Sequence, residues 1–412
     1  IGNLTKDAII RAAVSEGISV TQAVGSKSVF ETASVSYVSP TFDSNAGKVV
    51  ITYQDGGNSN YGTAVVATIS DTSISFGTPV VFEAASVDFV NATFDSTNNK
   101  VIIAYRDLGN SNAGTAIVGT VSGTSISFGT AAVFHSAAGG SGTYYLTATF
   151  DSNAGKVVFA YTYNAGATGY ATVGTVSGTS ISFGTPVEFR SNANYCTSTF
   201  DSSNNKVVIG YQMSDGSGRA KVGTVSGTSI SFGSEVTFAS SNTTMLTSTF
   251  DSTNNKVIFA YRDNGNSFYG TSVVGTVSGT SISFGSEVVF SSAQANVFGA
   301  AHDANAQRTI VYFRDQPNSA RGAIVVGTVS GTSISFSDIV ALGNTQEGAG
   351  SEHCLAYDST NQRIVVAFRD EANSNYGTTI VFKTGYSSAT GGTIADGAPV
   401  IVNANGTVSS VG

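Results

Sequence analysis

The hydrophobic and polar residues of this chain follow a pattern of short strands, and residues 87–128 show one complete block of it. Residues 101–106 are apolar on both alternating faces, which predicts a strand buried on both sides. Residues 124–128 alternate strictly between hydroxyl and large apolar side chains, which predicts a half-exposed strand. Together with residues 87–95 and 115–121, these two segments predict a four-stranded antiparallel sheet. Its strands are A to D in chain order, and strand D lies at the solvent-exposed outer edge.

The block recurs along the chain, and an Asp marks each copy: it stands in the phrase "TFDS" in five units, after His in unit six and after Tyr in unit seven. Successive markers are separated by 52, 56, 50, 50, 52 and 55 residues. The seven markers are Asp43, Asp95, Asp151, Asp201, Asp251, Asp303 and Asp358. Seven four-stranded units of about fifty residues predict an all-β fold, a seven-bladed β-propeller of antiparallel blades.

The two ends of the repeat array complement each other. Unit seven lacks the strand D phrase "SISFG", whereas residues 17–44 align with residues 73–96, which contain it. We therefore expect residues 18–30 to lie beside 378–382 and to complete the last blade, which removes the free edges of the ring. The predicted domains are an N-terminal lead-in at 1–16, for which a helix is one alternative, the propeller at 17–385, and a flanking tail or further module at 386–412.

The composition and net charge of the chain indicate which kinds of partner it is expected to bind. Only 11% of the 412 residues are charged, against about a quarter in ordinary domains, and the net charge is −8. This balance argues against nucleic acid as a partner. No run approaches the roughly 18 apolar residues of a membrane span, so no membrane insertion is expected. The two cysteines, Cys196 and Cys354, exclude a disulfide framework and are expected to be free, buried thiols.

The loops differ between the two faces of the predicted disc. The A–B and C–D turns are almost constant among the units, whereas the B–C loops and D–A links vary in length and chemistry. Units three and four have shortened B–C loops, and the link into unit three is long and rich in glycine. Variable loops on a rigid scaffold usually carry binding sites, so the B–C and D–A face is the predicted binding face.

Repeated acidic residues are the first candidates for chemistry. An Asp–x–x–Asn pair recurs in five B–C loops, from Asp55 and Asn58 to Asp370 and Asn373. Calcium binding is one interpretation, although the loops lack the acidic density of a calcium site. The structural alternative is that the side chains satisfy loop backbone groups, with the preceding arginine paired to a neighbouring Asp. No cofactor or metal is predicted. The marker aspartates repeat sevenfold, whereas a catalytic pair needs two unequal environments.

The histidines and tyrosines are the unrepeated candidates. His302 and His353 occupy positions that other units fill with core residues, and Glu352-His353-Cys354 has no second cluster to complete a metal or nucleophile site. His135 and four tyrosines gather in or beside the variable loops of unit three, and these form the predicted binding residues: His135, Tyr144, Tyr145, Tyr163 and Tyr170. Exposed tyrosine suits stacking on sugars or protein contact, and covering of neighbouring loops is the alternative.

The phrases "DSTNNKVIIAYRD" and "GTVSGTSISFGTPVVF" resemble repeat-type β-propeller proteins of tailed bacteriophages, marine ones especially. The resemblance covers about residues 17–385. It implies a structural protein of the virion, such as a tail fibre or appendage component, and it supplies no catalytic residues.

The sequence thus predicts a non-enzymatic structural or binding module located on a virion or otherwise outside cells. Its expected partners are other virion proteins or a glycan or protein of the host surface. An extracellular bacterial lectin or adhesin is the alternative, and a carbohydrate-active enzyme is a weaker one. Changing Tyr145, Tyr163 and Tyr170 together is expected to weaken attachment tenfold. The sequence does not determine the oligomeric state.

Overall fold

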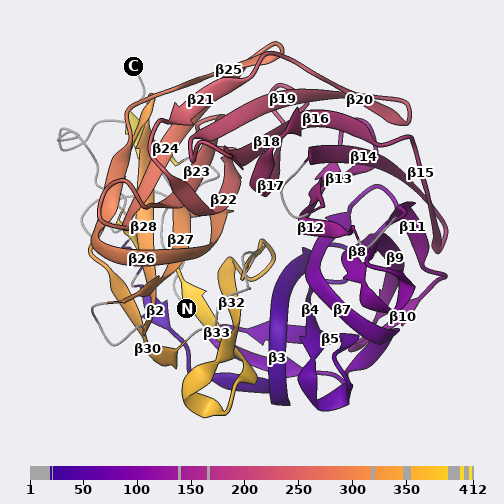
Figure 1. Cartoon of the computed structure of the whole chain (residues 1–412). Coiled ribbons are helices and arrows are strands. Elements are labelled where there is room, and N and C mark those ends of the chain that lie inside the picture. The colour runs from indigo at the N-terminus through magenta and orange to yellow at the C-terminus, as the bar shows by residue number, and fades with distance from the viewer. Residues whose placement is uncertain are drawn as a thin grey trace.

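The computed structural model describes residues 19–20, 22–137, 141–164, 168–316, 321–346, 354–387, 400–402 and 408–410. This part of the chain is made of antiparallel β-strands, with three single-turn 3-10 helices in B–C loops: η1 (Gly56–Asn58), η2 (Leu108–Asn110) and η3 (Glu371–Asn373). The sheets are arranged radially around a central axis, so the fold is a β-propeller (Figure 1). Within the described ranges, no helix has the length and apolar character needed to cross a membrane.

The first four repeat units have their strands in the predicted order. Unit one contains β3 (Ser28–Asp43), β4 (Lys48–Asp55), β5 (Tyr61–Ser70) and β6 (Ser73–Phe76). Unit two contains β7 (Val80–Asp95), β8 (Lys100–Asp107), β9 (Ala113–Ser122) and β10 (Ser125–Phe128). Unit three contains β12 (Thr143–Asp151), β13 (Lys156–Tyr163), β14 (Thr168–Ser177) and β15 (Ser180–Phe183). Unit four contains β17 (Ala193–Asp201), β18 (Lys206–Met213), β19 (Gly218–Ser226) and β20 (Ser229–Phe232).

The remaining units follow the same order. Unit five contains β22 (Thr243–Asp251), β23 (Lys256–Asp263), β24 (Tyr269–Ser278) and β25 (Ser281–Phe284). Unit six contains β26 (Val288–Asp303), β27 (Arg308–Asp315), β28 (Arg321–Ser330) and β29 (Ser333–Phe336). Unit seven contains β31 (Leu355–Asp358), β32 (Arg363–Asp370) and β33 (Tyr376–Lys383).

The outer strand D has two parts, a feature that the sequence pattern did not predict. In unit two, β10 pairs with the second half of β9, and β11 (Ala132–His135) then pairs with its first half. The equivalent second parts are β16 (Val187–Ser191), β21 (Val236–Ala239) and β30 (Val340–Gln346), or the first halves of β3, β7 and β26. The polar connection after "SISF" interrupts the alternation, so only the first part is evident from the sequence.

The predicted pairing of the two chain ends is present. β33 pairs with β2 (Ala23–Val24), where Val24 lies opposite Phe382, and with the first half of β3, where Ser28 lies opposite Thr379. The side chain of Phe30 packs on Gly377, where a Cβ added to the glycine would lie 2.4 Å from the Phe30 ring. The N-terminal segment therefore provides the outer strand beside β33.

The innermost strands contact one another around the axis in the order β3, β7, β12, β17, β22, β26 and β31, and β31 contacts β3. Small and polar side chains link neighbouring strands: the Ala92 amide donates to Ser39 Oγ (3.1 Å), and the Ala148 amide donates to Asn91 Oδ1 (2.8 Å). The core lies between adjacent sheets and includes fully buried tyrosines such as Tyr53 and Tyr105.

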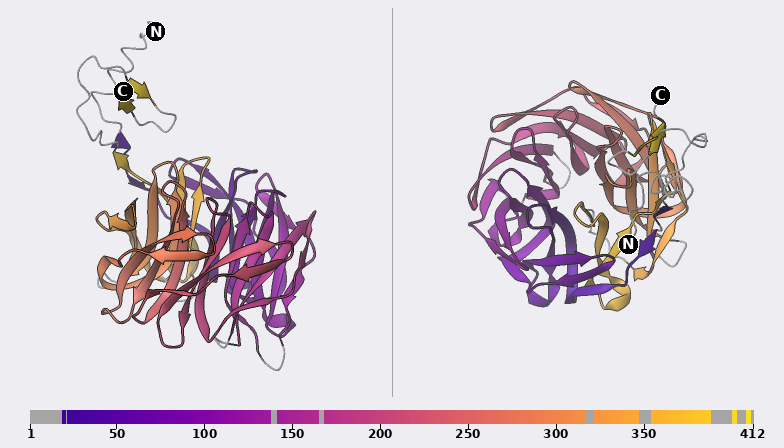
Figure 2. Two further views of the ribbon diagram at one scale, coloured as in Figure 1. Left: turned by 90° about the horizontal axis from the view of Figure 1, so that it is seen from above. Right: turned by 180° about the vertical axis from the view of Figure 1, so that it is seen from behind.

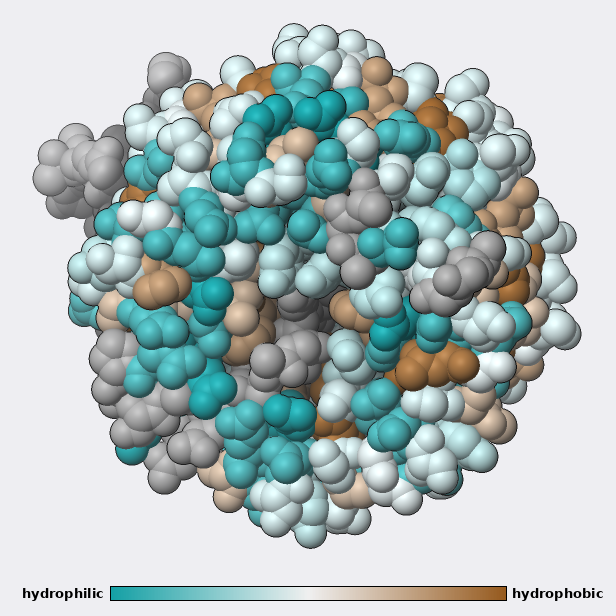
Figure 3. Space-filling model, viewed as in Figure 1, coloured by the Kyte–Doolittle hydropathy of each residue, from teal (hydrophilic) through white to brown (hydrophobic). Residues whose placement is uncertain are grey.

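The two faces of the disc differ in the loops and chain ends that they hold. We call the face that holds the B–C loops and D–A links the loop face, and the opposite one the turn face. β1 (Ser19–Val20) pairs with β34 (Tyr386–Ser387), and these strands leave the disc on the turn face (Figure 2). β35 (Val400–Val402) pairs with β36 (Val408–Ser410). The loop face is mostly polar and is hollowed near its centre (Figure 3). The expected segments 1–16 and most of 386–412 lie outside the described residues.

Candidate functional site

The repeated aspartates are used by the turns and loops that contain them. The marker Asp95 accepts hydrogen bonds from the amides of Thr97 and Asn98, both at 2.9 Å, and all seven marker aspartates have equivalent bonds. In the B–C loops, Asp263 accepts from the Gly265 amide (2.9 Å), and Asp107 accepts from the Asn110 amide (3.0 Å). These contacts support the structural interpretation of both sets. No group of three or more metal-ligating side chains occurs among the described residues.

A β-bulge near the start of the innermost strands changes the backbone on the loop face. In unit two, the register with β8 shifts between Asp88 and Asn91, so that two residues of β7 oppose one of β8. The first bulged residue, Phe89, has a φ of +47°. A bulky side chain rarely adopts this left-handed region, and bulges often redirect a side chain next to a functional site.

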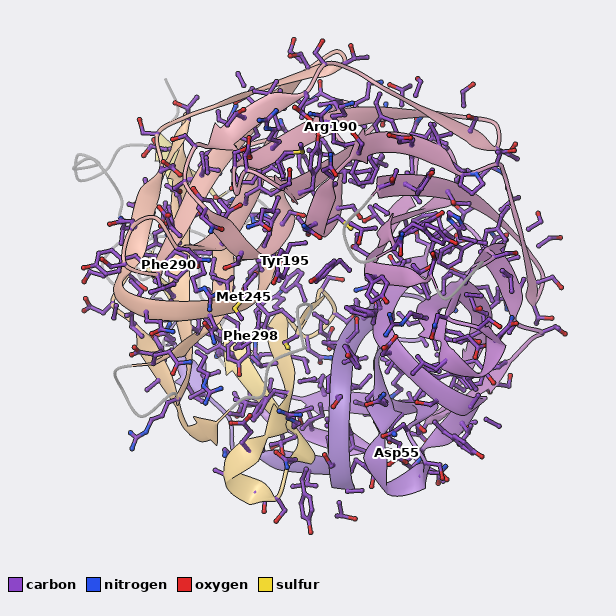
Figure 4. The ribbon with its side chains drawn as sticks, in the orientation of Figure 1. Asp55, Arg190, Tyr195, Met245, Phe290 and Phe298 are labelled. Carbon is purple, nitrogen blue, oxygen red and sulfur yellow. The ribbon has the colours of Figure 1, made fainter. Side chains whose placement is uncertain are left out.

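Four other units repeat this bulge with large side chains. The five bulged residues, which we call the mouth ring, are Tyr37, Phe89, Tyr145, Tyr195 and Met245, with φ between +44° and +52°. Each is half-buried, whereas the next residue in each strand is buried. The bulge thus sends one side chain into the core and leaves its neighbour partly exposed. Figure 4 shows Tyr195 and Met245 at the inner ends of their strands, beside the axis.

The aromatic members of the mouth ring contact one another in sequence around the axis. The ring centroids lie 5.3 Å apart for Tyr37 and Phe89, 5.6 Å for Phe89 and Tyr145, and 4.5 Å for Tyr145 and Tyr195. These tilted and edge-to-face contacts are favourable aromatic geometries. They hold a continuous, partly exposed aromatic surface at the centre of the loop face.

The predicted binding residues separate into two places. Tyr144 and Tyr145 lie at the mouth ring, where the Tyr144 ring stands 4.2 Å from the guanidinium of Arg106. His135, Tyr163 and Tyr170 lie away from it, in the slot between units two and three.

In that slot, which we call the outer aromatic cluster, the His135 imidazole stacks on Tyr163 at 4.4 Å and meets the edge of Tyr170 at 5.2 Å. Burial lowers the pKa of His135, and its Nδ1 lies 2.7 Å from the Tyr161 hydroxyl. The five residues therefore do not form one site, and a role of each in binding a ligand stays a prediction.

Other candidates have structural surroundings. Cys196 and Cys354 are buried thiols, as expected. His302 is a buried ring whose Nε2 lies 3.1 Å from Thr253 Oγ1. Glu352 and His353 lie outside the described residues. A polar pocket on the turn face is lined by Asp303, Asn305, Thr360, Asn361, Gln362, Arg363, Lys383 and Thr384.

Sequence reasoning named one member of the mouth ring, Tyr145, and missed the other four, although a signal was present. Each of its five residues stands six positions before a marker aspartate, so aligning the units places four aromatic residues and one methionine in a single column. The alternation of polar and apolar residues predicts only that this position lies on one face of a regular strand. Only the bulge, which the tertiary structure forms, turns it toward the axis.

The comparisons with known proteins agree with the fold. The structure is similar to the BP39L lectin from Burkholderia pseudomallei, with a TM-score of 0.61 and 11% identity over 87% of this chain and 97% of that one. A weaker similarity, with a TM-score of 0.46 and 12% identity, covers 76% of this chain and 97% of a mutant Aleuria aurantia lectin in complex with Fucα1-6GlcNAc. No protein-family profile and no curated protein sequence matches the chain.

Proposed function

We propose that this protein is a non-enzymatic carbohydrate-binding propeller that binds a glycan at the mouth ring. The observation that carries the proposal is the set of five large side chains held at left-handed φ beside the axis of the loop face. Backbone strain repeated at one position indicates that the side chains serve a purpose beyond packing. Partly exposed aromatic faces provide surfaces on which the C–H faces of sugars stack, with polar edges available for hydrogen bonds.

The surroundings of the mouth ring suit a glycan better than an apolar ligand. Half-buried polar side chains stand beside the mouth ring: Ser36 precedes Tyr37, Asn194 precedes Tyr195, and Asn264 begins the B–C loop of unit five. Sugars are recognised by a combination of stacking and many polar contacts, and this face offers both. The resemblance in fold to a propeller that is called a lectin supports the same class of ligand.

The chain path supports a role in display. The described ends of the ring leave on the turn face, so they do not cover the mouth ring. We further propose that the module is located on a virion or otherwise outside the cell, as the resemblance to phage propellers suggests. Mass spectrometry and immunogold labelling of purified particles test this location, and finding the protein only in the host cytoplasm contradicts it.

The circular contacts from β3 through β31 support a ring of seven blades, each with strands A, B and C and a two-part strand D. The same contacts support a propeller that spans residues 17–385. Limited proteolysis is expected to release this fragment in folded form. A stable fragment that lacks either residues 18–30 or residues 376–383 would contradict the proposed closure.

Binding to a panel of immobilised oligosaccharides tests the proposed function. Tyr145→Ala and Tyr195→Ala are each expected to weaken binding about tenfold, which corresponds to about 1.4 kcal/mol, because each removes a stacking surface. Tyr61→Ala is the matched control, since Tyr61 is also a half-buried tyrosine next to a B–C loop but lies outside the mouth ring. Equal binding by all three variants and the wild type, or no binding of any sugar, contradicts the proposal.

A further inference from the structure

Among the described residues, no acidic side chain offsets the charge of Arg262, an arginine beside the mouth ring. Arg106 in unit two and Arg262 in unit five occupy the same position, directly before the B–C loop and opposite the second residue of strand A. In unit two that opposite residue is Asp88, which forms a two-point ion pair with Arg106. In unit five it is Thr244, so the corresponding carboxylate is missing.

The hydrogen bonds of Arg262 go to neutral groups. Its Nε donates to Asn264 Oδ1 (2.8 Å) and Thr244 Oγ1 (3.0 Å), and its Nη1 donates to Asn296 Oδ1 (2.9 Å). Among the described residues, Nη2 has no hydrogen-bond partner and no carboxylate lies within ion-pair distance of the guanidinium. The neutral contacts fix the plane of the guanidinium and leave part of its hydrogen-bonding capacity unused.

The environment of Arg262 makes an uncompensated charge unfavourable. Arg262 is half-buried, and burial lowers the pKa of its guanidinium. For Arg106, burial acts in the same direction, but the bonds to Asp88 hold the pKa above its ordinary value. Because a guanidinium remains charged at any physiological pH, Arg262 keeps a partly desolvated positive charge. An anion placed beside it would remove this penalty.

The exposed aromatic side chain of Phe268 lies beside the guanidinium of Arg262. Phe268 is 44% exposed, and its ring lies 5.5 Å from the Arg262 guanidinium. Its φ is +63°, at a loop position where three other units have asparagine: Asn60, Asn112 and Asn375. Asparagine tolerates this conformation far better than phenylalanine does. Tyr195 of the mouth ring is close enough to Arg262 to act on its pKa.

We propose that Arg262 and Phe268 form a subsite for the anionic group of an acidic saccharide, either a sugar carboxylate or a sulfate ester. The guanidinium provides charge-assisted hydrogen bonds, Phe268 provides an apolar face for the sugar ring, and Tyr195 connects the subsite to the mouth ring. The inference rests on the proposed function and adds the chemical class of the ligand. A protein of net charge −8 repels anions in general, so this local cation gives selectivity for one position on the ligand.

Binding of three disaccharides with one common backbone tests the subsite: a neutral one, one with a terminal uronic acid and one with a sulfate ester. The wild type is expected to bind at least one acidic form about tenfold more tightly than the neutral form, with a preference that decreases as salt increases. Comparison of the two acidic forms identifies the anionic group. Arg262→Gln is expected to abolish the preference and to retain binding of the neutral sugar.

Thr244→Asp provides an independent variant, because it installs the pairing that unit two already contains between Asp88 and Arg106. It is also expected to abolish the preference while the melting temperature is unchanged. Ser36→Asp adds the same charge at the same strand position of unit one, opposite Gln54, and is expected to keep the preference. Arg369→Gln removes an equivalent arginine that is already paired with Glu371 (3.1 Å), and it serves as the second control.

The outcomes separate the two proposals. Equal affinity of the wild type for acidic and neutral sugars, or an intact preference in both Arg262→Gln and Thr244→Asp, overturns the subsite and leaves the proposed function standing. If Ser36→Asp also loses the preference for the acidic sugars, the subsite is overturned, because general charge repulsion would then explain the loss in Thr244→Asp. If no saccharide binds, the proposed function fails and the subsite fails with it.

Discussion

The closure of the ring depends on a contact between Phe30, near the start of the chain, and Gly377, near its end. Phe30 is 7% exposed, and its ring lies 5.1 Å from that of Tyr53 and 6.1 Å from that of Phe76. The same Phe–Gly contact occurs in five other places: Phe82–Gly62, Phe134–Gly114, Phe189–Gly169, Phe238–Gly218 and Phe290–Gly270. The closing contact is therefore built like the contacts inside the ring.

We predict that Phe30→Ala destabilises the protein by about 3–5 kcal/mol, the usual cost of truncating a buried phenylalanine. An unfolding entropy of about 2.1 cal/mol/K per residue over about 370 residues amounts to about 0.8 kcal/mol/K. The melting temperature should therefore fall by about 4–6 °C. Differential scanning calorimetry measures this decrease directly.

Phe134→Ala is the matched control, because Phe134 makes the equivalent contact with Gly114 inside the ring and is 4% exposed. If closure by the N-terminal segment holds, both variants should lose similar stability. A melting temperature that is unchanged in Phe30→Ala but lowered in Phe134→Ala would show that this closure is wrong. The N-terminal segment would then contribute nothing to the folded ring.

Two further predictions concern the side chain of His302 and those of two tyrosines. Burial lowers the pKa of His302 below its ordinary 6.5, so the unfolded chain binds the proton at higher pH, and stability is lost as the pH falls from about 6.5 toward the folded pKa. His302→Phe, which copies five other units, should reduce the decrease in melting temperature between pH 7.5 and 5, and an unchanged decrease contradicts this. Tyr163→Ala with Tyr170→Ala should change glycan affinity less than about threefold, and a tenfold loss would move the site to the outer aromatic cluster.

Most strands, the order of the repeat and the joining of the ends could be predicted from the sequence, whereas the second part of strand D could not. Strand alternation depends on which faces are buried, and this pattern is written directly in residues such as 101–106. The pairing of residues 23–29 with 378–383 followed from a strand missing at one end and present at the other, because a ring must satisfy its edges. The burial of Cys196 also followed, from its alignment with core positions.

Which side chains meet on the loop face depends on the folded ring, and the sequence pattern did not reveal it. Tyr145 and Tyr163 are near each other in sequence, yet the bulge in β12 directs Tyr145 to the axis, and β13 places Tyr163 in the slot between units two and three. The environment of Arg262 was hidden for a related reason. Whether a charge is compensated depends on the residue opposite it in the neighbouring strand, and the shifted register of the bulge sets that partner. Local alternation carries no information about it, because the partner lies 18 residues away and is chosen by packing around the axis.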